Sequence, residues 1–259
     1  MDLVIVGMGR AGGSLARASV DAGHRIAGIL SRRPFDPYAS LDWDRPLPPC
    51  DLAVISVSDG AIADVAQRLA ANWDPSTPAI HVSGFSSVDD LAALAQKGAS
   101  VGSFHPLQTL PDPERGAASL AGAWVAITAD DRLRPMLEEY ATSLGMHPFP
   151  LADESKGRYH AAAAAGANYV VEALAVATDL LAAAGVSSAV MQPLTRRVVE
   201  NVFETGAEAS LTGPIARGDL ATVAGQQAAA DSVSPELGQQ FRLLAQATAL
   251  RAGTDLGDL

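Results

Sequence analysis

Two histidines carry the side chains best suited to proton transfer. His105 ends an apolar segment and precedes Pro106, which favours an extended exit of the chain and restricts the direction of the imidazole. An imidazole in such a place can bind a substrate hydroxyl or carbonyl oxygen, or move its proton. The alternative is a structural histidine that pairs with the backbone. His160 is the second candidate for a proton donor.

Lys156, His160 and Asn168 form a further pattern. Their offsets of four and then eight residues place all three side chains on one face of a helix. The residues around them are mostly alanine, so a polar Lys/His/Asn stripe indicates a face that borders a catalytic site. A solvated helix face is the alternative.

Another polar stretch, Leu-Thr-Gly-Pro-Ile-Ala-Arg-Gly-Asp, covers residues 211–219. Arg217 can hold a substrate carboxylate through charge-assisted hydrogen bonds, and Asp219 can orient the guanidinium. Thr212 is a candidate substrate ligand. It is also a candidate N-cap for the following helix, because Pro214 would then stand near the first turn.

The start of the chain places a glycine pattern between a strand and a helix. Residues 3–6 are an apolar run typical of a buried parallel strand. In the G-x-G-x-x-G that follows, the first glycine allows a tight turn, the second lets a pyrophosphate approach the backbone, and the third allows close packing. The helix N-terminus offers free N–H groups to the phosphates. A glycine turn without a ligand is the alternative. The predicted phosphate loop consists of Gly7, Met8, Gly9, Arg10, Ala11 and Gly12.

The end of the second predicted strand, residues 24–30, indicates which dinucleotide binds. An NAD site usually has an acidic residue there to hold the ribose 2′-hydroxyl, whereas this chain has Ser31, Arg32 and Arg33. A hydroxyl and two guanidinium groups suit a 2′-phosphate. One charge-assisted hydrogen bond contributes about 1.5–3 kcal/mol, which predicts roughly ten- to a hundredfold preference for NADP. A solvated basic loop is the alternative.

Strands and helices alternate up to residue 151. Further strands are expected at residues 51–57, 79–84, 99–104, 123–128 and 146–149. Ser58 and Asp59 follow the first of these, where the nicotinamide half of a dinucleotide would lie, although Asp59 equally suits a helix cap. Later segments predict only helices, at residues 153–184, from 187 or 188 to 205, 215–230 and 235–252. We therefore expect an α/β fold: a doubly wound, mostly parallel Rossmann sheet in residues 1–151, followed by an all-helical C-terminal domain in residues 152–259.

The composition narrows the class of protein. The 259 residues are 48% hydrophobic and carry a net charge of −11, which makes nucleic acid and anionic membranes poor partners. Cys50 is the only cysteine, and the five histidines lack close metal-ligand spacing, so we expect no disulfide and no metal. We recognise no signal peptide and no apolar run of membrane-spanning length, and expect a cytoplasmic protein.

Four motifs carry a resemblance that extends over nearly the whole chain. They are the phosphate loop, Ser-Phe-His-Pro-Leu-Gln at residues 103–108, the helix with Tyr159, His160 and Asn168, and residues 211–219. The chain resembles the Rossmann proteins with a C-terminal helical domain of unknown function 2520. That family is similar to ketopantoate, pyrroline-carboxylate and prephenate reductases or dehydrogenases, which act on small carboxylates with NAD(P).

The resemblance implies roles for particular residues. In prephenate dehydrogenases a His-Pro motif at a matching strand end supplies a catalytic histidine, which supports His105. Ketopantoate reductases use a lysine of the helical domain with a glutamate. Lys156 corresponds to the lysine, but no glutamate partner is evident, and this departure leaves the substrate open. Enzymes of this kind often dimerise through the helical domain, so the resemblance implies a homodimer.

Together these patterns predict an NADP-dependent oxidoreductase that reduces a small 2-oxo acid, such as ketopantoate, or a cyclic imine acid. His105 or His160 would protonate the heteroatom, Asn168 would hold it, and Arg217 or Lys156 would bind the carboxylate. The alternatives are a non-catalytic NADPH sensor and a deazaflavin-dependent NADP reductase. The expected partners are a small carboxylate substrate and a second copy of the chain. The homodimer would form mainly through residues after 151.

Overall fold

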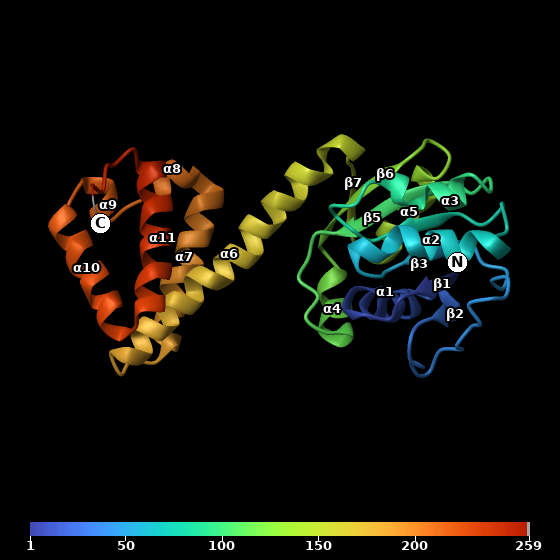
Figure 1. Ribbon diagram of the computed structural model, residues 1–259, viewed down its shortest axis with the longest axis horizontal. Coiled ribbons are helices and arrows are strands. Elements are labelled where there is room, and N and C mark those ends of the chain that lie inside the picture. The colour runs from blue at the N-terminus through green and yellow to red at the C-terminus, as the bar shows by residue number, and fades with distance from the viewer. Residues whose placement is uncertain (258–259) are drawn as a thin grey trace. The chain divides into compact units, whose positions relative to one another are not determined.

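The strands predicted in the first part of the chain form one seven-stranded sheet in the computed structural model, which describes residues 1–257 (Figure 1). The strand order is β2-β1-β3-β4-β5-β6-β7, and every neighbouring pair is parallel except β5 and β6. The expected doubly wound, mostly parallel sheet is therefore confirmed. The strands are β1 (Asp2–Val6), β2 (Arg25–Leu30), β3 (Leu52–Ile55), β4 (Ala79–His81), β5 (Val101–Pro106), β6 (Trp124–Ala129) and β7 (His147–Pro150).

The side chains of β1 show why the central strands are apolar throughout. Leu3 and Ile5 belong to one cluster of buried apolar side chains, whereas Val4 and Val6 belong to another. Successive side chains of a strand project to opposite faces of a sheet. Because helices cover both faces, all four of these side chains are fully buried.

Helices on both faces return the chain to the start of each parallel strand. Side chains from α1 (Arg10–Asp21), α4 (Pro113–Leu120) and α5 (Arg134–Ser143) join the cluster that contains Leu3 and Ile5. Side chains from α2 (Ile62–Leu69) and α3 (Ala92–Ala95) join the cluster on the other face. The carboxyl ends of β1 to β5 consequently share one edge of the sheet, which is where ligands bind in folds of this type.

From Lys156 to Gly257 the described chain forms helices and turns, as expected. The helices are α6 (Lys156–Ala183), α7 (Gln192–Thr205), α8 (Ala207–Ser210), α9 (Pro214–Arg217), α10 (Leu220–Val233) and α11 (Pro235–Ala252). Buried side chains such as Val223, Ala230 and Ala245 lie on α10 and α11. The side-chain amide of Gln227 donates to the backbone oxygen of Gly238 at 2.9 Å, which ties these two helices together.

The segment 215–230, predicted as one helix, is instead two helices. Gly218 adopts a left-handed conformation with φ of 70° and ends α9, and Asp219 then caps α10 by accepting from the backbone N–H of Thr222 at 3.2 Å. The predicted capping role of Thr212 is also wrong. Gly213 is the N-cap of α9, because its φ of 101° is a conformation that favours glycine.

Contacts divide the chain into two compact units, Met1–Ala164 and Ala165–Leu259. The division falls inside α6. The expected domain boundary at residue 151 stays a prediction. The first turns of α6 group with the α/β unit because Lys156 and Tyr159 form hydrogen bonds to residues of that unit. Candidate side chains on these first turns can therefore be related directly to the sheet.

Candidate functional site

The turn between β1 and α1 has the geometry of a phosphate loop. Gly7 has φ of 98°, and a Cβ there would lie 2.3 Å from the carbonyl oxygen of Ser56 on the neighbouring chain segment. A Cβ on Gly12 would lie 2.0 Å from the carbonyl oxygen of Gly7. Both glycines are thus required by the fold itself, for the tight turn and the close packing expected of them.

Gly9 is different, because nothing in the described protein lies within 4 Å of a Cβ placed there. Its φ of −75° is accessible to any residue. The open space therefore fits the approach of a ligand to the backbone, as expected for a pyrophosphate. Gly9 also caps α1 without a side-chain hydrogen bond, so the first-turn N–H groups remain free for an anion. Met8 and Ala11 are partly buried beside this turn, and Arg10 is exposed.

The basic segment after β2 lies beside this loop. The backbone N–H of Gly7 donates to the carbonyl oxygen of Leu30 at 2.7 Å, directly before Ser31. The hydroxyl of Ser31 donates to the backbone oxygen of Arg33. Arg32 and Arg33 are both exposed, and neither forms a salt bridge with a residue of the described chain. Two unpaired guanidinium groups thus stand next to the phosphate loop.

The loop after β3 borders the other side of the glycine turn. β3 pairs with β1, with Ile55 opposite Val6. Ser58 and Asp59 follow and are exposed. Ser58 is the N-cap of the short 3-10 helix Asp59–Ala61 but forms no side-chain capping bond, so Asp59 is not the cap. Both side chains keep their polar groups available at this edge of the sheet.

His105 stands near the carboxyl end of β5, at the same edge. Its Nδ1 lies 2.9 Å from the hydroxyl of Tyr159 in α6, and the two rings meet edge to face at a centroid distance of 5.4 Å. A Cβ on Gly84 would lie 2.7–2.9 Å from three atoms of the imidazole, so the glycine makes room for the ring. Burial, and then the nearby charges of His160 and Lys156, lower the pKa of His105 to about 4. The imidazole is therefore neutral near pH 7.

His160 lies one residue beyond Tyr159 and faces the same imidazole. The centroids of the His105 and His160 rings are 6.0 Å apart, and His160 also lies 6.0 Å from the ring of Phe85. Phe85 is 59% exposed, in the loop after β4. The structure thus brings together the two histidines that the sequence proposed as proton donors, with an exposed apolar side chain beside them.

Lys156 is buried rather than open to a substrate. Its side chain is among the largest fully buried ones, and Nζ donates to the backbone oxygen of Ser83 at 3.1 Å and to the hydroxyl of Ser103 at 2.7 Å. Burial lowers the pKa of Lys156 to about 8. This position does not suit the expected alternative in which Lys156 binds the substrate carboxylate. Its observed contacts attach the first turn of α6 to β5 and to the loop after β4.

The carboxylate of Asp153 also attaches the start of α6 to the loop after β4. Asp153 accepts hydrogen bonds from the hydroxyl of Ser87 at 2.6 Å and from the backbone N–H of Val88 at 3.0 Å.

His81, at the end of β4, is fully buried, and burial lowers its pKa to about 4. Its Nε2 is the one enclosed side-chain polar atom without a hydrogen-bond partner among the described residues.

The remaining candidates belong to the second unit. Asn168, Thr212 and Arg217 are exposed there. Asp219, expected to orient Arg217, instead accepts hydrogen bonds from the backbone N–H and the hydroxyl of Thr222. The role of Arg217 as a carboxylate ligand stays a prediction.

Sequence reasoning left two features of the histidine cluster without a role. Tyr159 follows Lys156 by three residues and precedes His160, so the helical spacing already placed it on their face. Ser103 and His105 are two residues apart on β5 and so share a face, which the strand period also predicts. The contact of Gly84 with His105 had no signal, because it joins loops that are distant in sequence.

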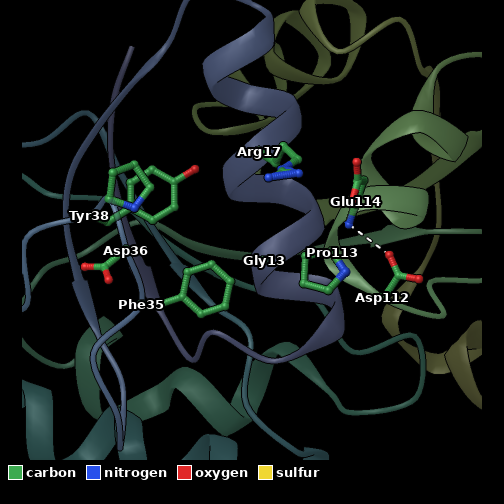
Figure 2. Close-up of a pocket in the computed structure, with 9 residues that line it drawn as sticks. Gly13, Arg17, Phe35, Asp36, Tyr38, Asp112, Pro113 and Glu114 are labelled. Atoms are coloured by element: carbon green, nitrogen blue, oxygen red, sulfur yellow. Dashed lines mark hydrogen bonds between the residues drawn. The ribbon is translucent and has the colours of Figure 1, made fainter.

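A surface pocket of about 370 Å³ lies along α1, next to the glycine turn and the segment after Arg33 (Figure 2). Figure 2 shows Phe35 and Tyr38 on one side and Pro113 on the other, with Arg17 between them. None of the predicted site residues lines this pocket. Its lining nevertheless includes Gly13 and Phe35, which adjoin the phosphate loop and the basic segment after β2.

The comparisons with known proteins agree with the expected resemblance. Residues 123–248 match a family described as a domain of unknown function, DUF2520. The match begins just before β6 and extends into α11, so it includes the histidine-facing start of α6. No curated protein sequence matches the chain.

Three crystal structures have the same fold over nearly their whole length. A Bacteroides fragilis protein assigned as an NADP oxidoreductase is 21% identical, with 96% of this chain and 98% of that chain covered and a TM-score of 0.82. Plasmodium falciparum pyrroline carboxylate reductase with NADP bound is 13% identical, with 97% and 98% covered and a TM-score of 0.64. A reductive aminase from Aspergillus terreus in complex with NADPH and ethyl levulinate is 18% identical, with 99% and 96% covered and a TM-score of 0.65.

Proposed function

We propose that this chain is an NADP(H)-dependent oxidoreductase that reduces a C=N or C=O bond of a small carboxylate. The observation that carries the proposal is the shared edge of the sheet. The glycine loop, the basic segment after β2 and the loop after β3 lie side by side there, and His105 stands farther along the same edge. The structurally similar proteins whose descriptions name NADP or NADPH support this choice.

The residues present fit NADP better than NAD. Gly9 leaves open space over the phosphate loop, and the first turn of α1 has no side-chain cap. Arg32 and Arg33 are exposed and form no salt bridge within the described chain, so their guanidinium groups are free to bind a 2′-phosphate. No acidic residue occupies the positions directly after β2, where a ribose 2′-hydroxyl would be held.

The bound cofactor would supply the hydride, and the chain would supply position and a proton. His105 is neutral near pH 7 and partly buried, so it would hydrogen-bond the reacting heteroatom as a donor. His160 borders the same space and is the second candidate donor. This arrangement favours a catalyst over a sensor, because a sensor needs no paired histidines beside the cofactor edge.

Of the two substrate classes, the cyclic imine acid is better supported than the 2-oxo acid. Two of the structurally similar proteins are described as a pyrroline carboxylate reductase and a reductive aminase, and another as an imine reductase from Streptomyces aurantiacus. The ketopantoate alternative loses support because Lys156 is buried and bonded to Ser83 and Ser103. Arg217 would then hold the carboxylate, with Asn168 and Thr212 as further substrate ligands.

The experiment is NADPH oxidation followed at 340 nm against a panel of cyclic imine acids, acyclic imines and 2-oxo acids. We expect turnover with a cyclic imine acid and little with its uncharged analogue. Turnover of only the 2-oxo acids would show that they, and not the cyclic imine acids, are the substrate class. NADPH binding without turnover of any member would favour the sensor alternative.

We also propose a homodimer formed through the helical part of the chain. The exposed apolar side chains on α6 and α7 are Tyr169, Val170, Val171, Leu194, Val198, Val199, Val202 and Phe203. Large apolar side chains exposed on neighbouring turns of two helices support an interaction site there. By length and composition the segment Asp153–Ala183 could cross a membrane, because an 18-residue window within it has a mean hydropathy of 1.3 and is 6% buried. This finding corrects the expectation that no apolar run reaches membrane-spanning length. Because Lys156 and Tyr159 attach its start to the sheet, we place a second copy, rather than lipid, on this face.

A further inference from the structure

We propose that Tyr159 is a positioning residue that holds His105 in the tautomer with the proton on Nε2. The observation is the 2.9 Å contact between the Tyr159 hydroxyl and Nδ1 of His105. In a neutral imidazole one ring nitrogen donates and the other accepts, so the partner of Nδ1 decides which nitrogen carries the proton. The identity of this partner therefore determines what His105 offers to a ligand.

Tyr159 acts as the donor in this contact. Burial raises the pKa of Tyr159 to about 12, so the phenol keeps its proton across the physiological range. Nδ1 of His105 is the one acceptor within hydrogen-bond distance of this hydroxyl among the described residues. The reverse arrangement would leave the phenol proton without an acceptor among the described residues and would use the weaker donor of the pair.

Packing holds both rings in place. The ring of Phe149 on β7 lies 6.0 Å from that of Tyr159, and Trp124 on β6 lies 6.1 Å from Phe149. On the other side, the His105 ring packs where any side chain at Gly84 would collide with it. The aromatic side chains thus orient the phenol, and the phenol orients the imidazole.

The second nitrogen of His105 remains available. No described residue hydrogen-bonds Nε2, yet Nε2 of His105 is not among the fully enclosed unpaired atoms, since only Nε2 of His81 is. His105 thus presents an N–H donor on its open side. The tautomer assignment rests on the contact with Tyr159 and is independent of any substrate, whereas its use, donating to the heteroatom of the substrate, rests on the proposed function.

The test is the tautomer of His105, read from its ring nitrogens by two-dimensional ¹H–¹⁵N correlation in protein labelled with ¹⁵N-histidine. His105 is assigned as the signal lost in His105→Asn. In the wild type we expect the Nε2–H form to exceed the Nδ1–H form by about tenfold, as one net hydrogen bond implies. In Tyr159→Phe the ratio should fall to within about threefold, with ring packing retained.

Tyr169→Phe is the matched control, because Tyr169 is an exposed tyrosine of the same helix. It should leave the His105 signal unchanged. A wild-type His105 in the Nδ1–H form, or an unchanged tautomer ratio in a folded Tyr159→Phe, would overturn the proposal. The measurement needs no substrate, so its result is independent of whether the proposed reaction is found. Where turnover is available, Tyr159→Phe should lower kcat and leave NADPH affinity unchanged.

Discussion

A Cβ on Gly12 would lie 2.0 Å from the carbonyl oxygen of Gly7, so the first turn of α1 and the turn after β1 meet backbone against backbone. No side chain can be inserted there without moving one of these segments. Gly9, between them, has open space and an ordinary φ. Within one motif, Gly7 and Gly12 are required by the fold, whereas Gly9 leaves room for a ligand.

We therefore expect Gly9→Ala and Gly12→Ala to fail in different ways. Gly12→Ala should lower the free energy of unfolding by about 2 kcal/mol or more, because backbone atoms must move. Gly9→Ala should change stability by less than about 0.5 kcal/mol but weaken NADPH binding roughly tenfold by occupying the approach to the phosphates. Chemical denaturation and calorimetric titration measure the two quantities. Normal NADPH affinity in a folded Gly9→Ala would contradict the assignment.

The exposed arginines after β2 should set the cofactor preference. Wild-type protein should bind NADPH at least about tenfold tighter than NADH, and Arg32→Ala or Arg33→Ala should remove most of that difference through loss of a charge-assisted contact. NADH affinity should remain within about twofold. Arg115→Ala, which removes an exposed arginine paired with Asp112, is the control. Equal affinities for the two cofactors in the wild type would reject the 2′-phosphate site.

The two histidines should be needed for turnover and not for cofactor binding. His105→Ala or His160→Ala should lower kcat roughly a hundredfold if that side chain is the proton donor. NADPH affinity should be nearly unchanged, because neither residue is part of the phosphate loop. His147→Ala, an exposed histidine on β7, serves as the control. Full activity in both His105→Ala and His160→Ala would rule out their proposed role.

Stability should fall as the pH is lowered from about 6.5 to 4. Burial lowers the pKa values of His81 and His105 to about 4 in the folded chain. Between these limits the unfolded chain binds protons at both histidines and the folded chain does not, so the free energy of unfolding decreases as the pH falls. Each histidine contributes up to about 3 kcal/mol. Denaturation at several pH values should show a shallower decrease in His81→Asn, and an identical slope would contradict the assignment.

The dimer should depend on the exposed apolar side chains of α7. Light scattering of the wild type at micromolar concentration should give twice the mass of one chain. Phe203→Asp, at a side chain that is 87% exposed, should shift the protein toward monomer because a carboxylate would be buried at the contact. Val20→Asp, at an exposed position on α1, should have no such effect. A monomeric wild type would refute the dimer.

Local pattern was sufficient for most elements of the fold and for the glycine turn after β1. The apolar run from Leu3 to Val6, the glycine spacing and the basic residues after Leu30 are short-range features, and each reports a local physical requirement. The same is true of the first turn of α6, where Lys156, Tyr159 and His160 share a face because of the helical period. Errors arose where a single backbone conformation decides the outcome, as at Gly213 and Gly218.

The sequence by itself determined the order of strands and helices, the phosphate loop and the identity of the candidate side chains. Only the tertiary structure decided their environments. It placed Tyr159 against His105, buried Lys156 between Ser83 and Ser103, and set Gly84 under the imidazole. These contacts join segments that are far apart along the chain. The pKa and tautomer of a side chain depend on such long-range neighbours and on burial, which residue spacing does not encode.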